Sequence, residues 1–322
     1  MKVAGFTFIR NARQFDFPVV EAITSVLPLC DAFFVAVGNS ADDTLQLVKS
    51  IPTRKIVTIE TVWDDSLSEG GSVYARETDK AFDAIPDEYE WCFYIQGDEV
   101  LHEKYLEEVR SAMLQWWSHP EVEGLLFSYR HFYGTYDYVG DSRHWYRKEV
   151  RIIRNDKSIR SYRDAQGFRK AGRKIKAVAV NAEIFHYGWV RHPLHMQRKI
   201  DAVQQYYGGL TSKEAANRAM QLEFRRADSP LLCGGEFQFD YSKNYDALTR
   251  FTGSHPAVMK ERIQKLNWNV TPDLSRKNMT LRYRVLHWFE KMTGIRPFEF
   301  RNYTLVKRSR FSGFPKSYQK GE

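Results

Sequence analysis

Residues 91–100 read Trp91-Cys92-Phe93-Tyr94-Ile95-Gln96-Gly97-Asp98-Glu99-Val100 and combine a strand pattern with two acids. A continuous apolar run that ends near a glycine is typical of a strand buried on both faces of a sheet. Carboxylates just past such a strand lie at its carboxyl end, where open α/β sheets bind ligands. Carboxylate oxygens suit a hard divalent cation such as Mg2+ or Mn2+. We therefore expect Asp98 to hold a metal ion that in turn holds a diphosphate, and Glu99 to be structural.

Strand and helix patterns alternate through the first hundred residues. Besides the stretch above, apolar runs predict strands at 3–9, 32–37 and 55–61, and helical spacing predicts helices at 17–28, 44–50 and 74–85. This order predicts an α/β fold with a mostly parallel, doubly wound sheet and helices on both faces.

The remaining chain divides near residue 208. Up to that point we predict helices at 103–118 and 192–207, strands at 123–133, 150–154 and 177–186, and loops at 134–148 and 160–176, the latter strongly basic. Beyond it we predict helices at 212–226 and 281–292, aromatic and basic loops, and a basic tail at 307–322. Residues 1–208 are thus expected to form the catalytic domain, and residues 209–322 a mainly helical, basic C-terminal extension.

The bulk composition describes a basic globular protein. The chain has 322 residues, a net charge of +8 and a pI near 9.2, which suggests an anionic partner. Its three cysteines are scattered and match no zinc or disulfide pattern, which favours a reducing compartment. We find neither a signal peptide nor an apolar run long enough to cross a membrane, so we expect a cytoplasmic protein. A Rossmann dehydrogenase is set aside because no Gly-x-Gly-x-x-Gly follows the first strand.

Four segments of the first hundred residues resemble the motifs of a known family. They are Ile9-Arg10-Asn11 after the first strand, Val37-Gly38-Asn39-Ser40-Ala41-Asp42-Asp43-Thr44 after the second, Arg76 in the third helix, and Gln96-Gly97-Asp98-Glu99 after the fourth strand. In this order they are similar to bacterial family 2 glycosyltransferases, which have the GT-A fold, and the resemblance covers about residues 3–190. Gly38 departs from the family, which often has a base-reading carboxylate there. Gln96 replaces the first acid of the metal motif.

The resemblance implies an inverting, metal-dependent glycosyltransferase of the hexosyltransferase class. Such an enzyme moves a sugar from a nucleotide-diphosphate sugar, here first of all a UDP-sugar, to an acceptor hydroxyl, in this case for a bacterial cell-envelope glycan. It implies that Asp98 and His186 bind Mn2+ or Mg2+. It also implies that the donor binds to Thr7, Ile9, Arg10, Asn11, Asn39, Asp42, Arg76 and Gln96.

The same resemblance places a general base on the loop before His186, where Asp164 stands. Asp141 and Glu149 are rival bases, and Asp164 could instead pair with a neighbouring arginine. Aromatic rings stack on sugars, so Trp145 and Trp189 are candidates for binding a carbohydrate or lipid-linked acceptor.

Several alternatives stay open at this stage. Asp98 could cap the helix at 103–118, and His186 could be an ordinary core histidine. The basic residues between 147 and 176 could clamp a diphosphate or form a solvated face, and the chain could be a nucleic-acid- or glycan-binding protein on a degenerate GT-A fold. No nucleic-acid-binding signature occurs, so we expect no nucleic-acid partner. The helix at 281–292 could pack on the catalytic domain or lie peripherally on the inner face of a membrane.

Overall fold

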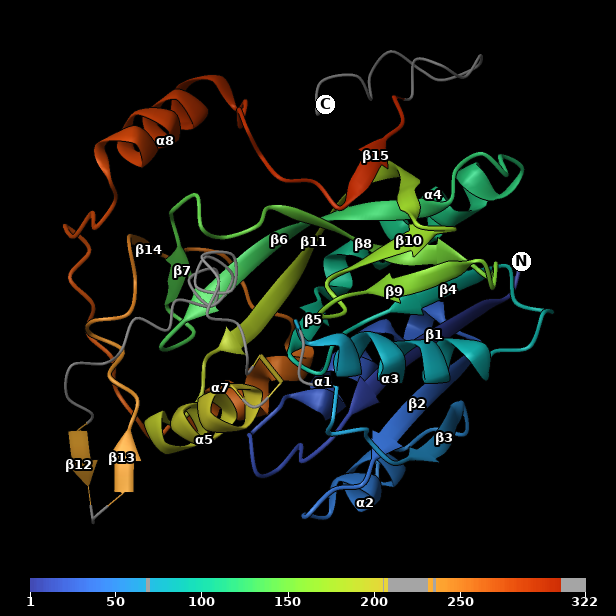
Figure 1. Cartoon of the computed structure of the whole chain (residues 1–322), viewed down its shortest axis with the longest axis horizontal. Coiled ribbons are helices and arrows are strands. Elements are labelled where there is room, and N and C mark those ends of the chain that lie inside the picture. Colours follow the sequence, from blue (N-terminus) through green and yellow to red (C-terminus); the bar gives the residue numbers. More distant parts are fainter. Residues whose placement is uncertain (68–69, 205, 208–230, 234–235, 308–322) are drawn as a thin grey trace.

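The computed structural model of the chain describes residues 1–67, 70–204, 206–207, 231–233 and 236–307. Its first hundred residues alternate between strand and helix as predicted, and β1 to β4 are parallel in the order β3-β2-β1-β4 (Figure 1). The elements are β1 (Val3–Ile9), α1 (Val19–Val26), η1 (Leu27–Leu29), β2 (Ala32–Gly38), α2 (Thr44–Lys49), β3 (Ile56–Thr61), α3 (Ser72–Asp83) and β4 (Trp91–Tyr94). The carboxyl ends of these four strands therefore meet at one edge of the sheet.

The next hundred residues extend this sheet with strands of both directions. The elements are β5 (Glu99–Leu101), η2 (Glu103–Tyr105), α4 (Leu106–Trp117), β6 (Gly124–Tyr133), β7 (Tyr138–Gly140), β8 (Lys148–Arg154), β9 (Ile159–Tyr162), β10 (Gly167–Lys170), β11 (Arg173–Trp189) and α5 (Pro193–Gln204). The sheet runs β3-β2-β1-β4-β8-β6-β11-β10-β9, with β8 antiparallel to both neighbours and β11 parallel to β6. The sheet is therefore mixed, and the expectation of a mostly parallel one holds for β1 to β4.

The segment 160–176, predicted to be a basic loop, forms a hairpin meander instead. Strands β9, β10 and β11 are antiparallel, as strands with such short connections must be. Lys170 pairs with Arg173 across Ala171 and Gly172, whose φ angles are 47° and 78°. Positive φ at both central residues is what a two-residue type I′ turn requires. The pattern was missed because arginines and lysines replace the usual apolar alternation.

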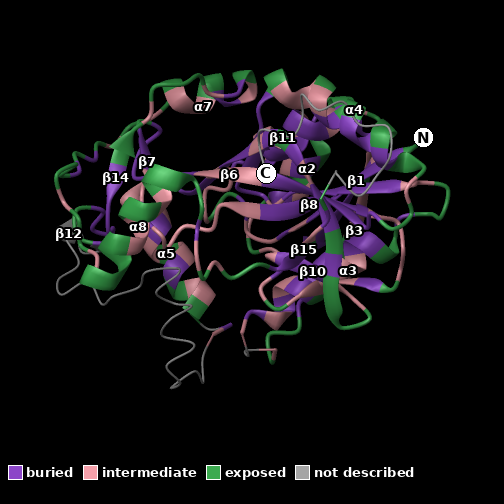
Figure 2. Ribbon diagram, turned by 90° about the horizontal axis from the view of Figure 1, so that it is seen from above, coloured by how far each residue is buried: buried purple, intermediate pink, exposed green. Residues whose placement is uncertain are grey.

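The stretch at 91–95 is buried on both faces, as its apolar run predicts. Trp91 and Phe93 pack with α1 and α4 on one face of the sheet, while Cys92 and Tyr94 pack with α3 and β10 on the other. Figure 2 shows the buried strands in the middle of the molecule. This two-sided packing fixes β4, and with it the loop that carries Asp98.

The described part of the C-terminal region is not mainly helical. Its elements are β12 (Leu231–Cys233), β13 (Glu236–Gln238), β14 (Leu248–Arg250), η3 (Ala257–Met259), α7 (Lys260–Gln264), α8 (Leu281–Thr293) and β15 (Tyr303–Leu305). Strand β15 joins the main sheet beside β11, and β14 pairs with β7. The helix predicted at 281–292 is confirmed as α8, whereas the one predicted at 212–226 and most of the basic tail lie outside the described residues. None of the described helices is long and apolar enough to cross a membrane.

Candidate active site

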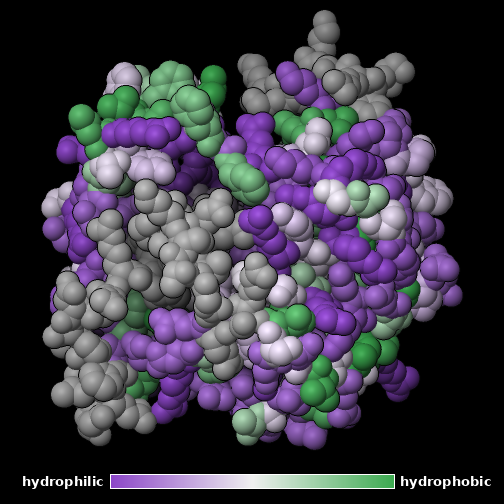
Figure 3. All heavy atoms as spheres, in the orientation of Figure 1, coloured by the Kyte–Doolittle hydropathy of each residue, from purple (hydrophilic) through white to green (hydrophobic). Residues whose placement is uncertain are grey.

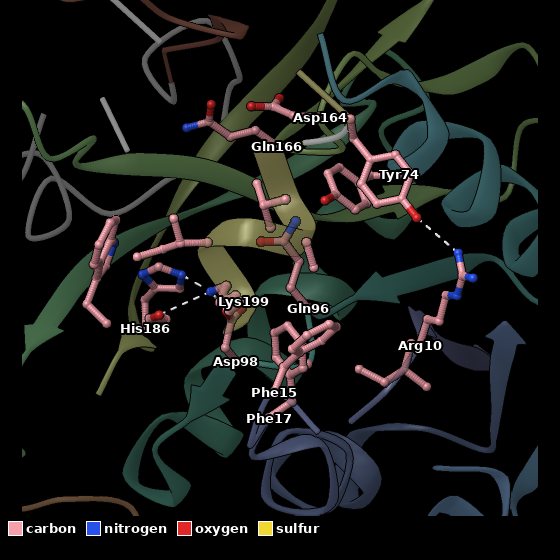
Figure 4. A pocket seen from close by; sticks show the side chains of 18 of the residues that line it. Arg10, Phe15, Phe17, Tyr74, Gln96, Asp98, Asp164, Gln166, His186 and Lys199 are labelled. Atoms are coloured by element: carbon pink, nitrogen blue, oxygen red, sulfur yellow. Dashed lines mark hydrogen bonds and ion pairs between the residues drawn. The ribbon is translucent and has the colours of Figure 1, made fainter. Parts of the chain in front are cut away.

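A cavity of about 310 Å3 opens at the carboxyl ends of β1 and β4. Arg10 and Asn11 reach it from the end of β1, Gln96 and Asp98 from the end of β4, and His186 from β11. Figure 4 shows Asp98, His186 and Lys199 together on one side, with Asp164 and Arg10 on other sides. The parallel half of the sheet and the later antiparallel strands thus contribute to one site.

Asp98 lies at the centre of a cluster of cationic and imidazole groups. Its Oδ2 is 3.2 Å from Lys199 Nζ and 3.4 Å from Arg191 Nη2, while its Oδ1 is 3.7 Å from His186 Nε2. Burial alone would raise the pKa of Asp98, but Lys199, His186 and Arg191 together hold this pKa below its usual value. The carboxylate is therefore ionised, with one oxygen paired to cations and the other facing the histidine.

A second histidine determines the tautomer of His186. His131 Nε2 is 2.8 Å from the carbonyl oxygen of Tyr146, which can only accept, so this nitrogen carries the proton. Burial, followed by the neighbouring His186, lowers the pKa of His131, so its ring is neutral and its Nδ1 accepts. His186 Nδ1 lies 2.9 Å from that nitrogen and must donate to it. The Nε2 of His186 consequently presents a lone pair toward Asp98.

Lys199 is the basic residue of this cluster that the cavity exposes. It lies on α5, and its ammonium group also donates to the carbonyl oxygen of Gly188 at 3.1 Å. Burial and the nearby Arg191 lower the pKa of Lys199 to about 8, although Asp98 opposes the shift. Arg191 itself is fully buried and stacks on Phe17 at 4.6 Å. Gly188 has to be small here, because a Cβ atom would lie 2.5 Å from the His186 ring.

Glu99, the neighbour of Asp98, points away from the cavity into the sheet. It accepts from Arg151 Nε at 2.8 Å and Nη2 at 2.7 Å, and from the Tyr129 hydroxyl at 2.8 Å. Its Oε2 also accepts from the backbone N–H of Gln96 at 3.1 Å, so Glu99 holds the turn that carries Asp98. Glu99 therefore has the structural role expected of it.

An aromatic box closes the end of the cavity near β1. Rings from Phe8, Trp63, Tyr74 and Tyr206 lie with centroids 5.5–5.9 Å apart. Arg10 stacks on Trp63 at 5.3 Å and donates to the Tyr206 hydroxyl at 2.9 Å. The Trp63 indole covers Gly38, where a Cβ atom would lie 2.3 Å from its Nε1. The ring thus fills the space above the position where the family often has its base-reading carboxylate.

The opposite end of the cavity is lined by Trp145 and Trp189. Their ring centroids are 6.3 Å apart in an edge-to-face arrangement, and Trp145 also stacks on His131 at 5.1 Å. Asp164 lines the cavity as well, on a turn whose flanking residues Arg163 and Ala165 have φ angles of 57° and 60°. Gln96 Nε2 donates to the Ala165 carbonyl at 3.4 Å and ties this turn to β4.

The structure separates the other candidates into two groups. Ile9, Arg10, Asn11 and Gln96 line the cavity together with Asp98, His186, Asp164, Trp145 and Trp189. The remaining predicted donor residues lie elsewhere. Thr7 is buried in β1, and Arg76 is exposed on α3. The Asn39 side-chain oxygen accepts from the backbone N–H of Trp63, and the Asp42 carboxylate accepts from the backbone N–H groups of Arg13 and Gln14.

The two rival bases also lie outside the cavity lining. Asp141 pairs with Lys291 at 2.5 Å. Glu149 is buried beside Asn302, and burial raises its pKa to about 8.

The basic region from 147 to 176 is largely used in internal contacts. Its arginines and lysines pair with acids or backbone carbonyls, as in Arg147–Glu299, Arg151–Glu99, Arg154 with the Val122 carbonyl, Arg160–Asp83, Lys170–Asp156 and Arg173–Glu123. These contacts join neighbouring segments of the fold, and the side chains of Arg160 and Arg173 remain partly exposed in their pairs.

Sequence reasoning missed His131, Lys199, Arg191 and the aromatic box. Lys199 and Met196, Ile200 and Val203 share the cavity-facing side of α5 at helical spacing, but this pattern equally suits core packing. The His131–His186 pair depends on the register of β6 and β11, in which these two residues are direct partners.

Comparison with known proteins finds weak similarity to solved structures. Family models and curated proteins give no match to the chain. Among solved structures, TarS 1–349 of S. aureus is 14% identical, covering 71% of this chain and 74% of that one with a TM-score of 0.34. The complex of TarS 1–349 with UDP-GlcNAc gives 13% identity, 70% and 71% coverage and a TM-score of 0.34.

A third solved structure covers less of the chain. Glucosyl-3-phosphoglycerate synthase of Mycobacterium tuberculosis with Mn2+, UDP and glucosyl-3-phosphoglycerate is 14% identical, with 41% and 45% coverage and a TM-score of 0.27. Similarity at this level does not establish an activity, so the function has to be argued from the site.

Proposed function

We propose that the protein is a glycosyltransferase that moves a sugar from a nucleoside-diphosphate sugar to an acceptor hydroxyl. The observation that carries this proposal is that the ionised Asp98 carboxylate, the His186 Nε2 lone pair 3.7 Å from it, and the cations Lys199 and Arg191 converge at one place. This centre lies in one cavity between an aromatic end and a tryptophan-lined end. The cationic groups of this centre suit a diphosphate. The aromatic box and the tryptophan-lined end offer ring surfaces on which a nucleobase and a sugar can stack.

The residues present fit a divalent cation. A carboxylate oxygen and a neutral imidazole nitrogen are suitable ligands, and Mg2+ or Mn2+ commonly takes few protein ligands besides phosphate oxygens and water. Asp98 Oδ1 and His186 Nε2 are the two side-chain ligands that would hold Mn2+ or Mg2+, since the described residues contain no group of three or more His, Cys, Asp or Glu side chains suited to a metal. Bound there, the cation would neutralise charge on the departing diphosphate.

The chain's own residues supply the rest of the proposed mechanism. Lys199 offers an ammonium group to the diphosphate, and Arg191 keeps Asp98 oriented by occupying its other oxygen. The aromatic box takes the nucleobase.

Asp164 is the proposed general base. It lines the cavity on a different side from Asp98, which suits attack by an acceptor hydroxyl on the face of the sugar opposite the leaving diphosphate (Figure 4). Such an attack inverts the anomeric centre. The hydroxyl proton passes to the Asp164 carboxylate as the new glycosidic bond forms and the bond to the diphosphate breaks.

The finer assignments belong to the same proposal. We take the enzyme to be a family 2 member of the hexosyltransferase class that uses a UDP-sugar. Its acceptor would be a carbohydrate or a lipid-linked sugar in the synthesis of a cell-envelope glycan, on the cytoplasmic side. The two tryptophans at 145 and 189 would form the acceptor surface.

Thermal stability with nucleotides tests the proposal. The protein is heated with UDP, GDP, ADP or dTDP, each with and without Mn2+, and a rise in melting temperature is expected with at least one of them. Asp98→Asn should abolish the rise, whereas Asp201→Asn on α5 serves as the matched control because its carboxylate pairs with Gln197 on the exposed side of that helix. No rise with any nucleotide, or salt-dependent binding of RNA or DNA in its place, would overturn it.

A further inference from the structure

Helix α8 is packed with its polar side against the protein. Glu290 pairs with Arg143 at 2.9 Å and with Arg147 at 3.3 Å, and His287 faces Asp141 at 3.7 Å. Thr280 caps its first turn, and Gly294, with φ 70°, ends it in the left-handed conformation. These polar contacts hold α8 in place although every residue of the helix remains at least partly exposed.

The opposite side of α8 is apolar and faces solvent. Residues spaced four, three and four apart lie on one stripe, and the loop after the helix extends it. The exposed fractions are 76% for Leu281, 56% for Val285, 64% for Trp288, 70% for Met292, 61% for Ile295 and 85% for Phe298. Figure 3 shows hydrophobic side chains gathered over the region of α8 at the upper left of the molecule. A soluble helix normally buries this stripe and exposes its polar one.

Acidic and basic side chains lie on different sides of residues 281–301. Both acids between residues 281 and 301 are turned inward, with Glu290 14% and Glu299 12% exposed, and both are paired with arginines. The bases Arg282, Arg284, Lys291 and Arg301 are exposed, and of these Lys291 pairs with Asp141 and Arg301 with Glu299. The outer surface is therefore apolar in the middle and cationic at its margins.

We propose that the apolar stripe of α8 and its basic margins form a docking surface for an anionic lipid bilayer. Apolar side chains with tryptophan and phenylalanine enter the acyl boundary, and flanking arginines and lysines contact acidic headgroups. A second copy of the chain is a poorer occupant, because a symmetric contact through this stripe would bring the same cations face to face. The inward pairing of both acids removes the charges that a membrane would repel.

The docking surface adjoins the tryptophan-lined end of the cavity. Tyr283 packs on His144 with ring centroids 5.4 Å apart, and Arg296 donates to the Trp145 carbonyl at 2.8 Å. His144 and Trp145 both line the cavity. If the proposed function holds, docking would bring that end to the membrane surface, where a lipid-linked acceptor resides.

Vesicle co-sedimentation of the full chain tests the surface directly. Vesicles of phosphatidylcholine alone are compared with vesicles of equal parts phosphatidylcholine and phosphatidylglycerol. We expect binding to the anionic vesicles at about 0.1 M salt and its loss at about 1 M, where surface charges are screened. Arg282→Gln with Arg284→Gln should weaken the partition coefficient by about fivefold per removed cation.

An apolar variant and its control complete the test. Trp288→Ser with Phe298→Ser should reduce binding at least tenfold, whereas Leu114→Ser with Trp117→Ser, on exposed positions of α4, should leave it unchanged. An equal loss of vesicle binding in the α8 and α4 double variants, or no preference for anionic vesicles, would overturn the proposal. Dimerisation in sedimentation that the α8 variants abolish would assign the surface to a second copy. Because nucleotide-induced stabilisation is measured separately, failure here leaves the proposed function standing.

Discussion

Replacing Glu99 by glutamine should destabilise the protein more than any exposed ion pair could. Glu99 and Arg151 are both fully buried, and their two hydrogen bonds are 2.7 and 2.8 Å long. Glutamine keeps the volume but removes the charge, so the Arg151 guanidinium is left buried and unneutralised. Removing one partner of a buried pair costs about 3–5 kcal/mol of unfolding free energy.

Urea unfolding measures this loss as a lower transition midpoint at unchanged slope. The matched control is Glu261→Gln, which removes the same charge from an exposed pair with Lys265 and should leave the midpoint nearly unchanged. Adding Arg151→Met to Glu99→Gln should recover part of the loss, because it removes the unpaired charge. A Glu99→Gln midpoint equal to that of the control would refute the structural role given to this acid.

Three further predictions concern the site and its surroundings. His131→Leu should weaken binding of UDP with Mn2+ by about 10- to 100-fold in calorimetry, since His186 loses the acceptor that fixes its tautomer, and undiminished affinity would contradict this. Asp164→Asn should lower kcat by about 100- to 10,000-fold while leaving nucleotide affinity unchanged, and a parallel fall in both would assign Asp164 to binding. Glu149→Gln should remove a pH dependence of stability. Burial raises the pKa of Glu149 to about 8 in the folded state, so its stabilising contribution is complete below the unfolded pKa near 4.5 and is lost as the pH rises through about 8. Melting temperatures from pH 5 to pH 9 measure this, and an unchanged slope in the variant would count against it.

Local patterns in the sequence predicted the parallel half of the fold well. The run at 91–95 is buried on both faces because its alternate residues meet α1 and α4 on one side and α3 on the other. Helix α8 begins at Leu281, as its amphipathic spacing predicted, and the structure shows Thr280 and Gly294 capping its two ends. The hairpins of β9 to β11 were not predicted because Ile159, Phe168 and Ile175 enter the core as isolated apolar residues among basic and polar ones, which leaves no apolar alternation in the sequence.

The position of a cavity residue could be predicted where that residue comes directly after a buried strand in the sequence. Asp98 and Arg10 fall into this class, because the end of a buried strand fixes the sheet edge. His131 and Lys199 fall outside it. Their roles depend on which residues of β6 and β11 become partners and on how α5 packs back over the cavity, and neither is written in a local pattern.

The two adjacent acids show how one strand end serves both stability and chemistry. Asp98 lies in a turn that the Glu99 backbone N–H closes by donating to the Gln96 carbonyl at 3.0 Å, and its side chain enters the cavity. Glu99 begins β5, and its side chain points into the sheet. Glu99 is neutralised by Arg151 from β8, whereas the cations around Asp98 come from residues 191 and 199, after β11. The Asp98 site therefore depends on residues that follow β11 in the sequence. A variant that loosens α5 should weaken nucleotide binding while leaving the Glu99–Arg151 pair, and most of the unfolding free energy, in place.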